Sequence, residues 1–204
     1  MFSLKKKIYS FFYKVSAHSQ AGQDLFALEL FGKNGTYIDI GSGNPVSGNN
    51  SYLLEVKNNW LGFCIDYDVS QKVNWKNNNE RINKIYWDDA TLFDYKKAVI
   101  ENKLPINIDF LSCDIEPQDK TFLALKKVFT DGLRPKAIAF ETDYYREKID
   151  YSSKADLFLK PYGYQIAVKN VYSNLKKKKI FETWFVHNSL NFKAIEYKDW
   201  IKKF

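Results

Sequence analysis

A strand-like run that ends in two glycines constrains the fold of this chain more than any other segment. The run Thr36-Tyr37-Ile38-Asp39-Ile40 is mostly apolar or β-prone, and Gly41-Ser42-Gly43-Asn44 follows it directly. Glycine lets a backbone turn sharply and approach a ligand closely, so the pattern predicts a buried strand that leads into a nucleotide-type cofactor site. Glycine pairs also occur in ordinary turns, and the rest of the chain decides between these two interpretations.

Strand-like and helix-like segments alternate along most of the chain. The expected strands are 36–40, 60–65, 82–87, 106–113 and 135–140, and the expected helices are 25–31, 49–56, 94–103, 122–129 and 153–159. Two more apolar runs, 164–168 and 180–186, flank the lysine cluster 176–179 and predict an antiparallel pair. The alternation predicts an α/β fold with a mostly parallel sheet, one reversed strand near the C-terminus and helices on both faces.

Carboxylates follow several of the expected strands. Asp66 lies 25 residues beyond Gly41, where an acid of a doubly wound sheet binds ribose hydroxyls, although a solvated turn residue is the alternative. Asp89 and Ala90 follow the third strand and suit an adenine ring, which needs a flat pocket and an acceptor for its amino group.

The fourth and fifth strands deliver further acids. Asp114 and Glu116 follow the fourth strand, and Glu141 and Asp143 follow the fifth. The carboxyl ends of parallel strands are the usual location for chemistry in open α/β sheets. We therefore expect a reaction centre at this edge.

Composition sets limits on partners and compartment. Lys and Arg total 31 against 24 Asp and Glu, and the net charge of +7 favours an anionic partner. Cys64 and Cys113 lie in apolar runs, which favours packed thiols in a reducing, cytoplasmic compartment over a disulfide. Residues 1–18 predict a basic amphipathic leader that packs on the protein or contacts an anionic membrane surface, and residues 19–204 predict one domain.

Six segments together resemble one enzyme family. They run in order from residue 19 to residue 141: Ser19-Gln20-x-Gly22-Gln23-Asp24-Leu25-Phe26, Tyr37-Ile38-Asp39-Ile40-Gly41, Asn50-Ser51-x-Leu53-Leu54-Glu55, Trp60-x-Gly62-Phe63-Cys64-Ile65-Asp66, Asp109-x-Leu111-Ser112-x-Asp114-Ile115-Glu116 and Ala139-Phe140-Glu141. The chain thereby resembles the FkbM-like S-adenosylmethionine-dependent methyltransferases. It departs from them at Asn44-Pro45, at Asp66-Tyr67 and at Pro117.

The resemblance implies a Rossmann-like class I methyltransferase fold of about seven strands with S-adenosyl-L-methionine as cofactor. Within it, Asp39 is expected near the methionine amine and Asp66 on the ribose. The complete set of expected cofactor contacts is Gln20, Asp39, Gly41, Ser42, Gly43, Asn50, Ser51, Asp66, Tyr67, Asp89, Ala90 and Asp114.

Methyl transfer from a sulfonium to a hydroxyl needs alignment of the two partners and a base for the hydroxyl proton. Alignment accounts for about 7–11 kcal/mol of such a barrier, and a positioned base for roughly 10²- to 10⁴-fold in rate. Asp114 is the first candidate for the base, with Glu116 and His187 as further candidates; Asp114 as a helix cap and His187 as a packing residue are the alternatives.

A divalent cation and His18 are secondary candidates for the site. Asp114, Glu141 and Asp143 are candidate ligands for Mg²⁺ or Mn²⁺ through their oxygen atoms, whereas pairing of Glu141 with a lysine is the alternative. His18 precedes the family-like segment and is a candidate to lie over the cofactor.

Three functions compete at this stage. The first is an O-methyltransferase acting on a sugar hydroxyl of a glycan, a nucleotide sugar or a lipid-linked saccharide. The second is a nucleic-acid ribose 2′-O enzyme that uses Lys176 to Lys179 against phosphates, and the third is a cofactor-binding module without turnover.

Overall fold

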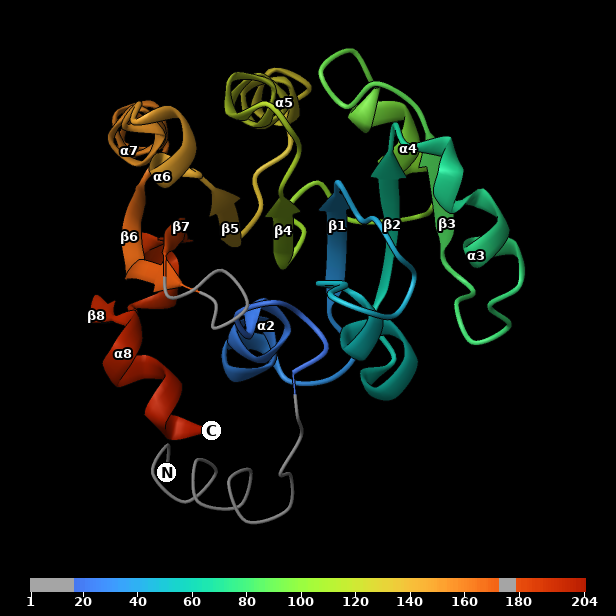
Figure 1. Ribbon diagram of the computed structural model, residues 1–204, viewed down its shortest axis with the longest axis horizontal. Helices are drawn as coiled ribbons and strands as arrows, with labels where there is room; N and C mark the ends of the chain where they lie inside the picture. The colour runs from blue at the N-terminus through green and yellow to red at the C-terminus, as the bar shows by residue number, and fades with distance from the viewer. Residues whose placement is uncertain (1–16, 173–178) are drawn as a thin grey trace.

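An eight-stranded sheet runs through the computed structural model, which describes residues 17–172 and 179–204. The strand order is β3-β2-β1-β4-β5-β7-β6-β8 (Figure 1). Their bounds are β1 Thr36–Ile40, β2 Leu61–Asp66, β3 Lys84–Trp87, β4 Phe110–Cys113, β5 Ala137–Glu141, β6 Tyr164–Tyr172, β7 Ile180–His187 and β8 Ile195–Glu196. The eighth strand has two residues, too few for a strand pattern in the sequence. Most of the expected leader and most of the lysine cluster lie outside the described residues.

The pairing confirms a mostly parallel sheet with one reversed strand. β1 pairs in parallel with β2 and β4, and β3, β5 and β8 also have parallel partners. β7 is antiparallel to both β5 and β6. The chain continues from β1 to β2 and β3 on one side, and β4 and β5 lie on the other side. The gap between β1 and β4 is therefore the topological switch point, where open α/β sheets bind ligands.

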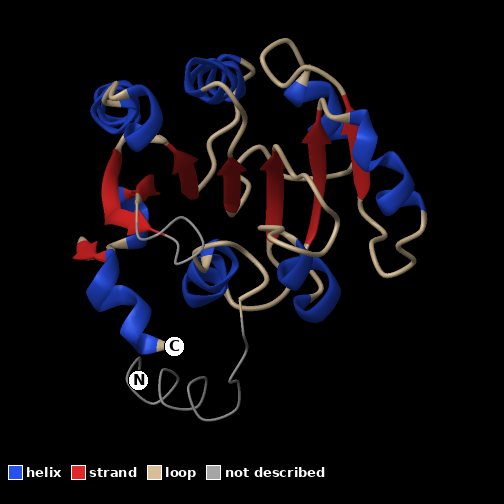
Figure 2. Ribbon diagram, in the orientation of Figure 1, coloured by secondary structure: helices blue, strands red, loops and turns tan. Residues whose placement is uncertain are grey.

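Helices cover both faces of the sheet, as expected (Figure 2). α2 (Gln23–Phe31), the π-helix η1 (Leu53–Lys57) and α8 (Tyr197–Trp200) pack on one face. α4 (Tyr95–Glu101), α5 (Gln118–Thr130) and α7 (Tyr151–Leu159) pack on the other. The remaining short elements are η2 (Val69–Gln71), α3 (Lys72–Lys76), α6 (Tyr144–Glu147), η3 (Lys160–Tyr162), η4 (Asn188–Leu190) and η5 (Ile201–Lys203). In the part of the chain that is described, no helix has the length and apolar character needed to cross a bilayer.

The central strand β1 shows how the sequence directs these two layers. Ile38 and Ile40 belong to the core under α4 and α5, whereas Tyr37 faces α2 and η1. Asp39 alternates with Ile38 and Ile40, so it shares the face of Tyr37. A strand that is buried on both faces needs apolar side chains throughout, which makes the buried carboxylate of Asp39 an exception that needs an explanation.

Two expected elements are shorter than their patterns. The expected helix 49–56 is realised as the five-residue η1, because Asn49 uses its side chain to hold the preceding loop. β4 begins at Phe110 rather than residue 106, although Ile106 and Ile108 still accept backbone hydrogen bonds from the segment before β5.

Candidate cofactor and acceptor site

Three of the expected cofactor residues, Asp89, Asp66 and Gly41, lie at or just beyond the carboxyl ends of β3, β2 and β1. The Asp66 Oδ2 atom accepts a hydrogen bond from Gly43 N at 2.6 Å, which joins the end of β2 to the glycine turn. The backbone of Asp88 donates to the Asp66 carbonyl at 3.1 Å and joins the end of β3 to the same point. On the other side of the switch point, Asp114 N donates to Ile40 O at 3.0 Å.

The two glycines of the turn have different surroundings. Gly41 has a φ of +80°, and a Cβ there would lie 1.6 Å from the carbonyl oxygen of Asp114. Gly43 has a φ of +55°, and nothing lies within 4 Å of the position of its Cβ. Gly41 is therefore required by the close approach of the residue that follows β4, whereas Gly43 borders open space.

The Asp66 carboxylate accepts hydrogen bonds from the turn that follows β2 and from the glycine turn, and it can accept more. Its Oδ1 accepts from Asp68 N at 2.7 Å, and its Oδ2 accepts from Gly43 N. An ionised carboxylate has about four lone-pair sites, so both oxygens retain one for ribose hydroxyls. The next residue, Tyr67, has a side chain that reaches into solvent beside this carboxylate, with 79% of the residue exposed.

Asp89 and Ala90, which the sequence predicts to contact the adenine, lie in the turn that follows β3. Asp89 Oδ1 accepts from the backbone and the hydroxyl of Thr91, and these hydrogen bonds keep the pKa of Asp89 below its ordinary value. Ala90 is buried, and its carbonyl accepts a 2.7 Å hydrogen bond from the Tyr95 hydroxyl. A charged acceptor and a small residue therefore lie side by side in a rigid turn.

Three buried oxygens around the glycine turn make no hydrogen bond within the described residues. They are Asp39 Oδ1, Ser42 Oγ and Asn50 Oδ1. Burial raises the pKa of Asp39, against the opposing effects of hydrogen bonds from Ser51 and Ser112 and of the positive charge of Arg81. Orphaned buried acceptors are costly, and their gathering beside the switch point indicates a ligand that donates hydrogen bonds.

The segment before α2 meets the loop after the glycine turn. Ser19 forms an isolated bridge with Gly48, and the Gln20 side chain lies beside the same glycine. Ser19 is fixed by Asp24, whose Oδ1 accepts from the Ser19 hydroxyl at 2.6 Å. His18 contacts the ring of Tyr52, with the ring centroids 4.6 Å apart.

The acceptor side of the sheet edge is acidic. Asp114 is half-buried and directly follows β4, and Pro117 rather than Asp114 occupies the N-cap position of α5. Glu141, at the end of β5, is in register with Glu182 of β7, and both are buried. Glu182 was not a candidate from the sequence, because only the reversal of β7 brings its start to this edge.

Buried donors hold Glu182 and Glu141. Glu182 accepts from Gln23 at 2.7 Å and from the Trp184 indole at 2.6 Å. Glu141 accepts from Gln118 at 3.3 Å. One partner of the Glu141 carboxylate is therefore a neutral amide.

Glu116 and Asp143 both contact Arg146 of α6. Arg146 Nη1 pairs with Glu116, and its Nε lies 3.1 Å from Asp143 Oδ2. No group of three or more His, Cys, Asp or Glu side chains able to hold a metal ion occurs within residues 17–172 and 179–204. The expected Mg²⁺ or Mn²⁺ ligands Asp114, Glu141 and Asp143 are thus not assembled into such a group.

His187 lies at the opposite edge of the sheet. Because β7 runs antiparallel, its last residue lies beside the start of β5, where His187 N donates to Lys136 O at 2.9 Å. Its ring is hydrogen-bonded to Ser189 and packs against Tyr164. The structure thus places His187 at the opposite edge from Asp114, which the sequence could not show because it does not reveal the direction of a strand.

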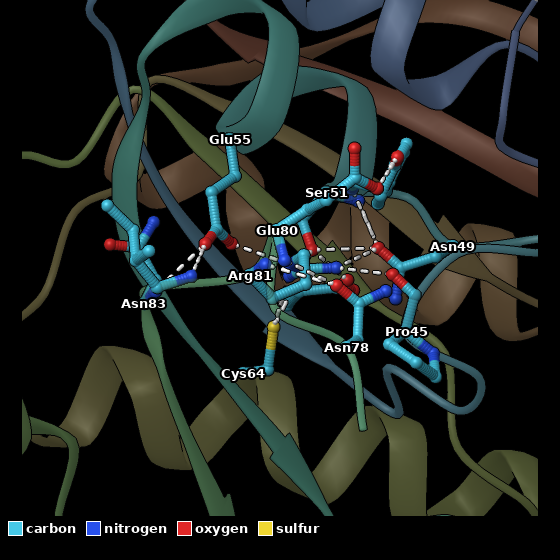
Figure 3. A network of polar contacts seen from close by, with 12 residues as sticks. Pro45, Asn49, Ser51, Glu55, Cys64, Asn78, Glu80, Arg81 and Asn83 are labelled. Carbon is cyan, nitrogen blue, oxygen red and sulfur yellow. Dashed lines mark hydrogen bonds and ion pairs between the residues drawn. The ribbon is translucent and has the colours of Figure 1, made fainter. Parts of the chain in front are cut away.

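A buried arginine that the sequence did not single out lies under the glycine turn. The Arg81 side chain is 1% exposed and forms an ion pair with Glu55, with 2.6 Å between Nε and Oε2 (Figure 3). Glu55 also accepts from the Tyr37 hydroxyl and from the backbone of Ile82 and Asn83. In the sequence, Arg81 stands in a polar stretch that is typical of a solvated loop, so only its burial marks it.

Comparison with known proteins supports the fold and not a family. No family model matches the chain, and no curated protein matches it either. Among solved structures, S. pombe Dnmt2 methyltransferase aligns with a TM-score of 0.56 at 15% identity over 83% of this chain and 53% of its own. The small RNA methyltransferase HEN1 aligns with a TM-score of 0.53 at 13% identity, over 90% of this chain and 27% of its own.

A third structure was solved with the expected cofactor. Streptococcus pneumoniae Sp1610 in complex with S-adenosyl-L-methionine aligns with a TM-score of 0.51 at 9% identity, over 82% of this chain and 72% of its own. The chain spans about half the length of Dnmt2 and about a quarter of HEN1. Together with the switch point between β1 and β4, these likenesses show that the chain has the Rossmann-like fold of class I methyltransferases.

Proposed function

We propose that the protein is an S-adenosyl-L-methionine-dependent O-methyltransferase that methylates a sugar hydroxyl of a glycan or of a nucleotide- or lipid-linked saccharide. The observation that carries the proposal is the order of groups along the sheet edge. An adenine-type turn at Asp89, a ribose-type carboxylate at Asp66 and a glycine turn at Gly41 lead to the half-buried Asp114. The choice of a sugar as the acceptor rests on the resemblance of the sequence to the FkbM-like enzymes.

The residues around the turn fit this cofactor. The buried oxygens Asp39 Oδ1, Ser42 Oγ and Asn50 Oδ1 lack donors, and the ammonium of a methionine group carries three. Asp66 offers acceptors for ribose hydroxyls, and the exposed ring of Tyr67 and the small Ala90 border the place for the adenine. The cofactor supplies an electrophilic methyl group on a sulfonium sulfur.

The protein's part in the reaction is alignment and proton removal. Asp114 directly follows β4 and its backbone lies beside Gly41, so we assign its carboxylate as the group that accepts the proton of an acceptor hydroxyl. With S-adenosyl-L-methionine bound at this edge, the cofactor would supply the methyl group, and the Asp114 carboxylate would accept the proton that the acceptor hydroxyl releases. Glu116 is held by Arg146 on an exposed loop and is better placed to contact the acceptor's outer part.

The charge of the acceptor side favours a sugar over a nucleic acid. Asp114 directly follows β4, Glu141 ends β5, Asp143 comes two residues later, and Glu182 lies near the start of β7. Carboxylates repel phosphates and are good acceptors for sugar hydroxyls. A ribose 2′-O methyltransferase remains the second candidate because the chain carries a net charge of +7.

Calorimetry with S-adenosylhomocysteine tests cofactor binding. We expect the wild-type protein to bind it and Asp66→Asn to weaken binding about tenfold, because an ionised acceptor for the ribose is lost. Asp68→Asn is the matched control, since Asp68 is exposed and caps η2 instead. No binding to the wild-type protein at millimolar ligand would refute the proposal.

Methyl transfer to a panel of saccharides, followed by mass spectrometry, tests the reaction. Asp114→Asn is expected to lower kcat by about 10²-fold or more while cofactor affinity changes little, as for loss of a general base. Cofactor binding with no transfer to any saccharide, and no difference in Asp114→Asn, would favour the non-catalytic module.

A further inference from the structure

The guanidinium of Arg81 joins the entry to β3 to the loop that follows the glycine turn. Its Nε donates to Glu55, whereas Nη1 donates to Pro45 O at 2.8 Å and to Asn49 Oδ1 at 2.9 Å. Its Nη2 donates to Ser51 Oγ at 3.0 Å. Three of these four partners belong to the loop that continues from Gly43, and Figure 3 shows them converging on the guanidinium.

Asn49 extends these contacts to the glycine turn itself. Its Nδ2 donates to Ser42 O at 2.8 Å and to Asn44 O at 3.0 Å, while its Oδ1 accepts from Arg81. The Asn49 side chain therefore touches both sides of Gly43. Asn49 therefore links the Arg81 guanidinium to the two backbone carbonyls that flank this glycine.

Trp75 provides a second connection between Arg81 and the turn. The Arg81 guanidinium carbon lies 4.5 Å from the centroid of the Trp75 ring. The Trp75 indole nitrogen donates to Gly43 O at 2.9 Å. Consecutive carbonyls of the turn, from residues 42, 43 and 44, are thus all held by side chains that contact Arg81.

We propose that Arg81 is a positioning residue for cofactor binding, which fixes the shape of the turn at residues 42–44 through Asn49 and Trp75. The inference rests on the proposed function of the turn. Only arginine offers five N–H donors in one rigid plane, so a lysine at this position keeps the charge for Glu55 but cannot hold the loop as well.

Two conservative substitutions separate positioning from simple stabilisation. Arg81→Lys keeps the ion pair with Glu55, and Asn49→Asp keeps an acceptor for Arg81 but removes the donor to Ser42 O and Asn44 O. Arg134→Lys is the matched control: Arg134 donates to two backbone carbonyls and stacks on Phe129 and Tyr162, on the face of the sheet covered by α5 and α7.

Calorimetry with S-adenosylhomocysteine is the first readout. We expect Arg81→Lys and Asn49→Asp each to raise Kd about tenfold, the change that accompanies loss of one charge-assisted or buried hydrogen bond. The double variant should raise Kd by much less than the product of the two, because both act on one route. Arg134→Lys should lower the unfolding midpoint and leave Kd unchanged. An unchanged Kd in Arg81→Lys, or fully multiplicative effects, would overturn the proposal.

Amide hydrogen exchange of the ligand-free protein is the second readout and does not depend on the cofactor. Faster exchange at residues 42–52 in Arg81→Lys, but not in Arg134→Lys, is the expected result. If the wild-type protein binds no S-adenosylhomocysteine, the proposed function fails and this comparison alone decides whether Arg81 positions the loop. Equal exchange in the two variants would refute that role.

Discussion

At the scale of single residues, the two glycines of the turn make different predictions. Gly41→Ala must relieve a contact of 1.6 Å with the Asp114 carbonyl at a φ of +80°. We expect it to lower the free energy of unfolding by more than about 3 kcal/mol or to prevent folding. Gly43→Ala meets open space and should lower it by only about 1 kcal/mol, the strain of a positive φ. Urea unfolding measures both, and similar losses would contradict the assigned roles.

Asp39 makes a prediction about pH. Burial raises its pKa above the ordinary value of 3.8, so the folded protein binds its proton more tightly than the unfolded chain does. The protonated Asp39 side chain therefore makes its full contribution to stability below pH 3.8. That contribution is lost as the pH rises through the raised pKa, because the buried group must then ionise. Asp39→Asn should be more stable than wild type at pH 7, and the gain should vanish toward pH 3.8.

A second prediction for Asp39 concerns its affinity for the cofactor. If Asp39 Oδ1 meets the methionine amine, Asp39→Asn gains stability and loses affinity for S-adenosylhomocysteine in the same protein. Asp68 is a control for which the change in stability has the opposite sign, because hydrogen bonds from Ser70 lower the pKa of Asp68. Asp68→Asn should lose stability at neutral pH, and this loss should vanish below the lowered pKa. Full affinity in Asp39→Asn would contradict the assignment.

Residue patterns reveal some site positions and conceal others for physical reasons. The placement of Gly41 and Asp66 at one edge of the sheet was predictable, because each of them directly follows a strand-like run in the sequence. Arg81 was not, because partners such as Glu55 and Pro45 lie 26 and 36 residues away along the chain and only burial makes it different from a solvated arginine. The placement of His187 needed the direction of its strand, which depends on pairing across the sheet.

At the scale of elements, the apolar patterns predicted the existence and order of the strands better than their lengths. β4 is shorter than its apolar run because residues 106–109 approach the chain before β5 without regular pairing. β8 could not be predicted, since two residues carry no alternation. The packing of α2 was partly visible in its apolar residues, but its partners on β7 and α8 were not.

The packing of α2 on the reversed strand β7 makes the element-scale prediction. Phe26 is fully buried and stacks on Trp184 of β7, with the ring centroids 4.7 Å apart. Phe26→Ala should lower the free energy of unfolding by about 3–5 kcal/mol, through lost burial and a cavity. Leu157→Ala, in the exposed face of α7, should change it by less than about 0.5 kcal/mol. Denaturant unfolding compares the two, and equal effects would mean that α2 is not docked as described.

At the scale of the whole molecule, the distribution of charge separates the two proposed substrate classes. The net charge is +7, yet the described acceptor edge carries Asp114, Glu141, Asp143 and Glu182. Four of the lysines, at positions 193, 198, 202 and 203, belong to the C-terminal segment, which packs on the face of the sheet covered by α2. Any attraction to a polyanion should therefore act away from the reaction centre.

Filter binding of single-stranded RNA over a salt series tests this separation. We expect weak binding that falls steeply with salt, since each neutralised phosphate releases counterions and adds roughly 0.7 to the slope of log K against log salt. Reversal of Lys202 and Lys203 to glutamate should reduce the slope, and Asp114→Asn should leave it unchanged. RNA bound away from the cofactor site should leave the Kd of S-adenosylhomocysteine unchanged, and by linkage S-adenosylhomocysteine should then leave the affinity for RNA unchanged. Tight RNA binding coupled to the cofactor, with methyl groups found on ribose, would instead identify the protein as the ribose 2′-O enzyme.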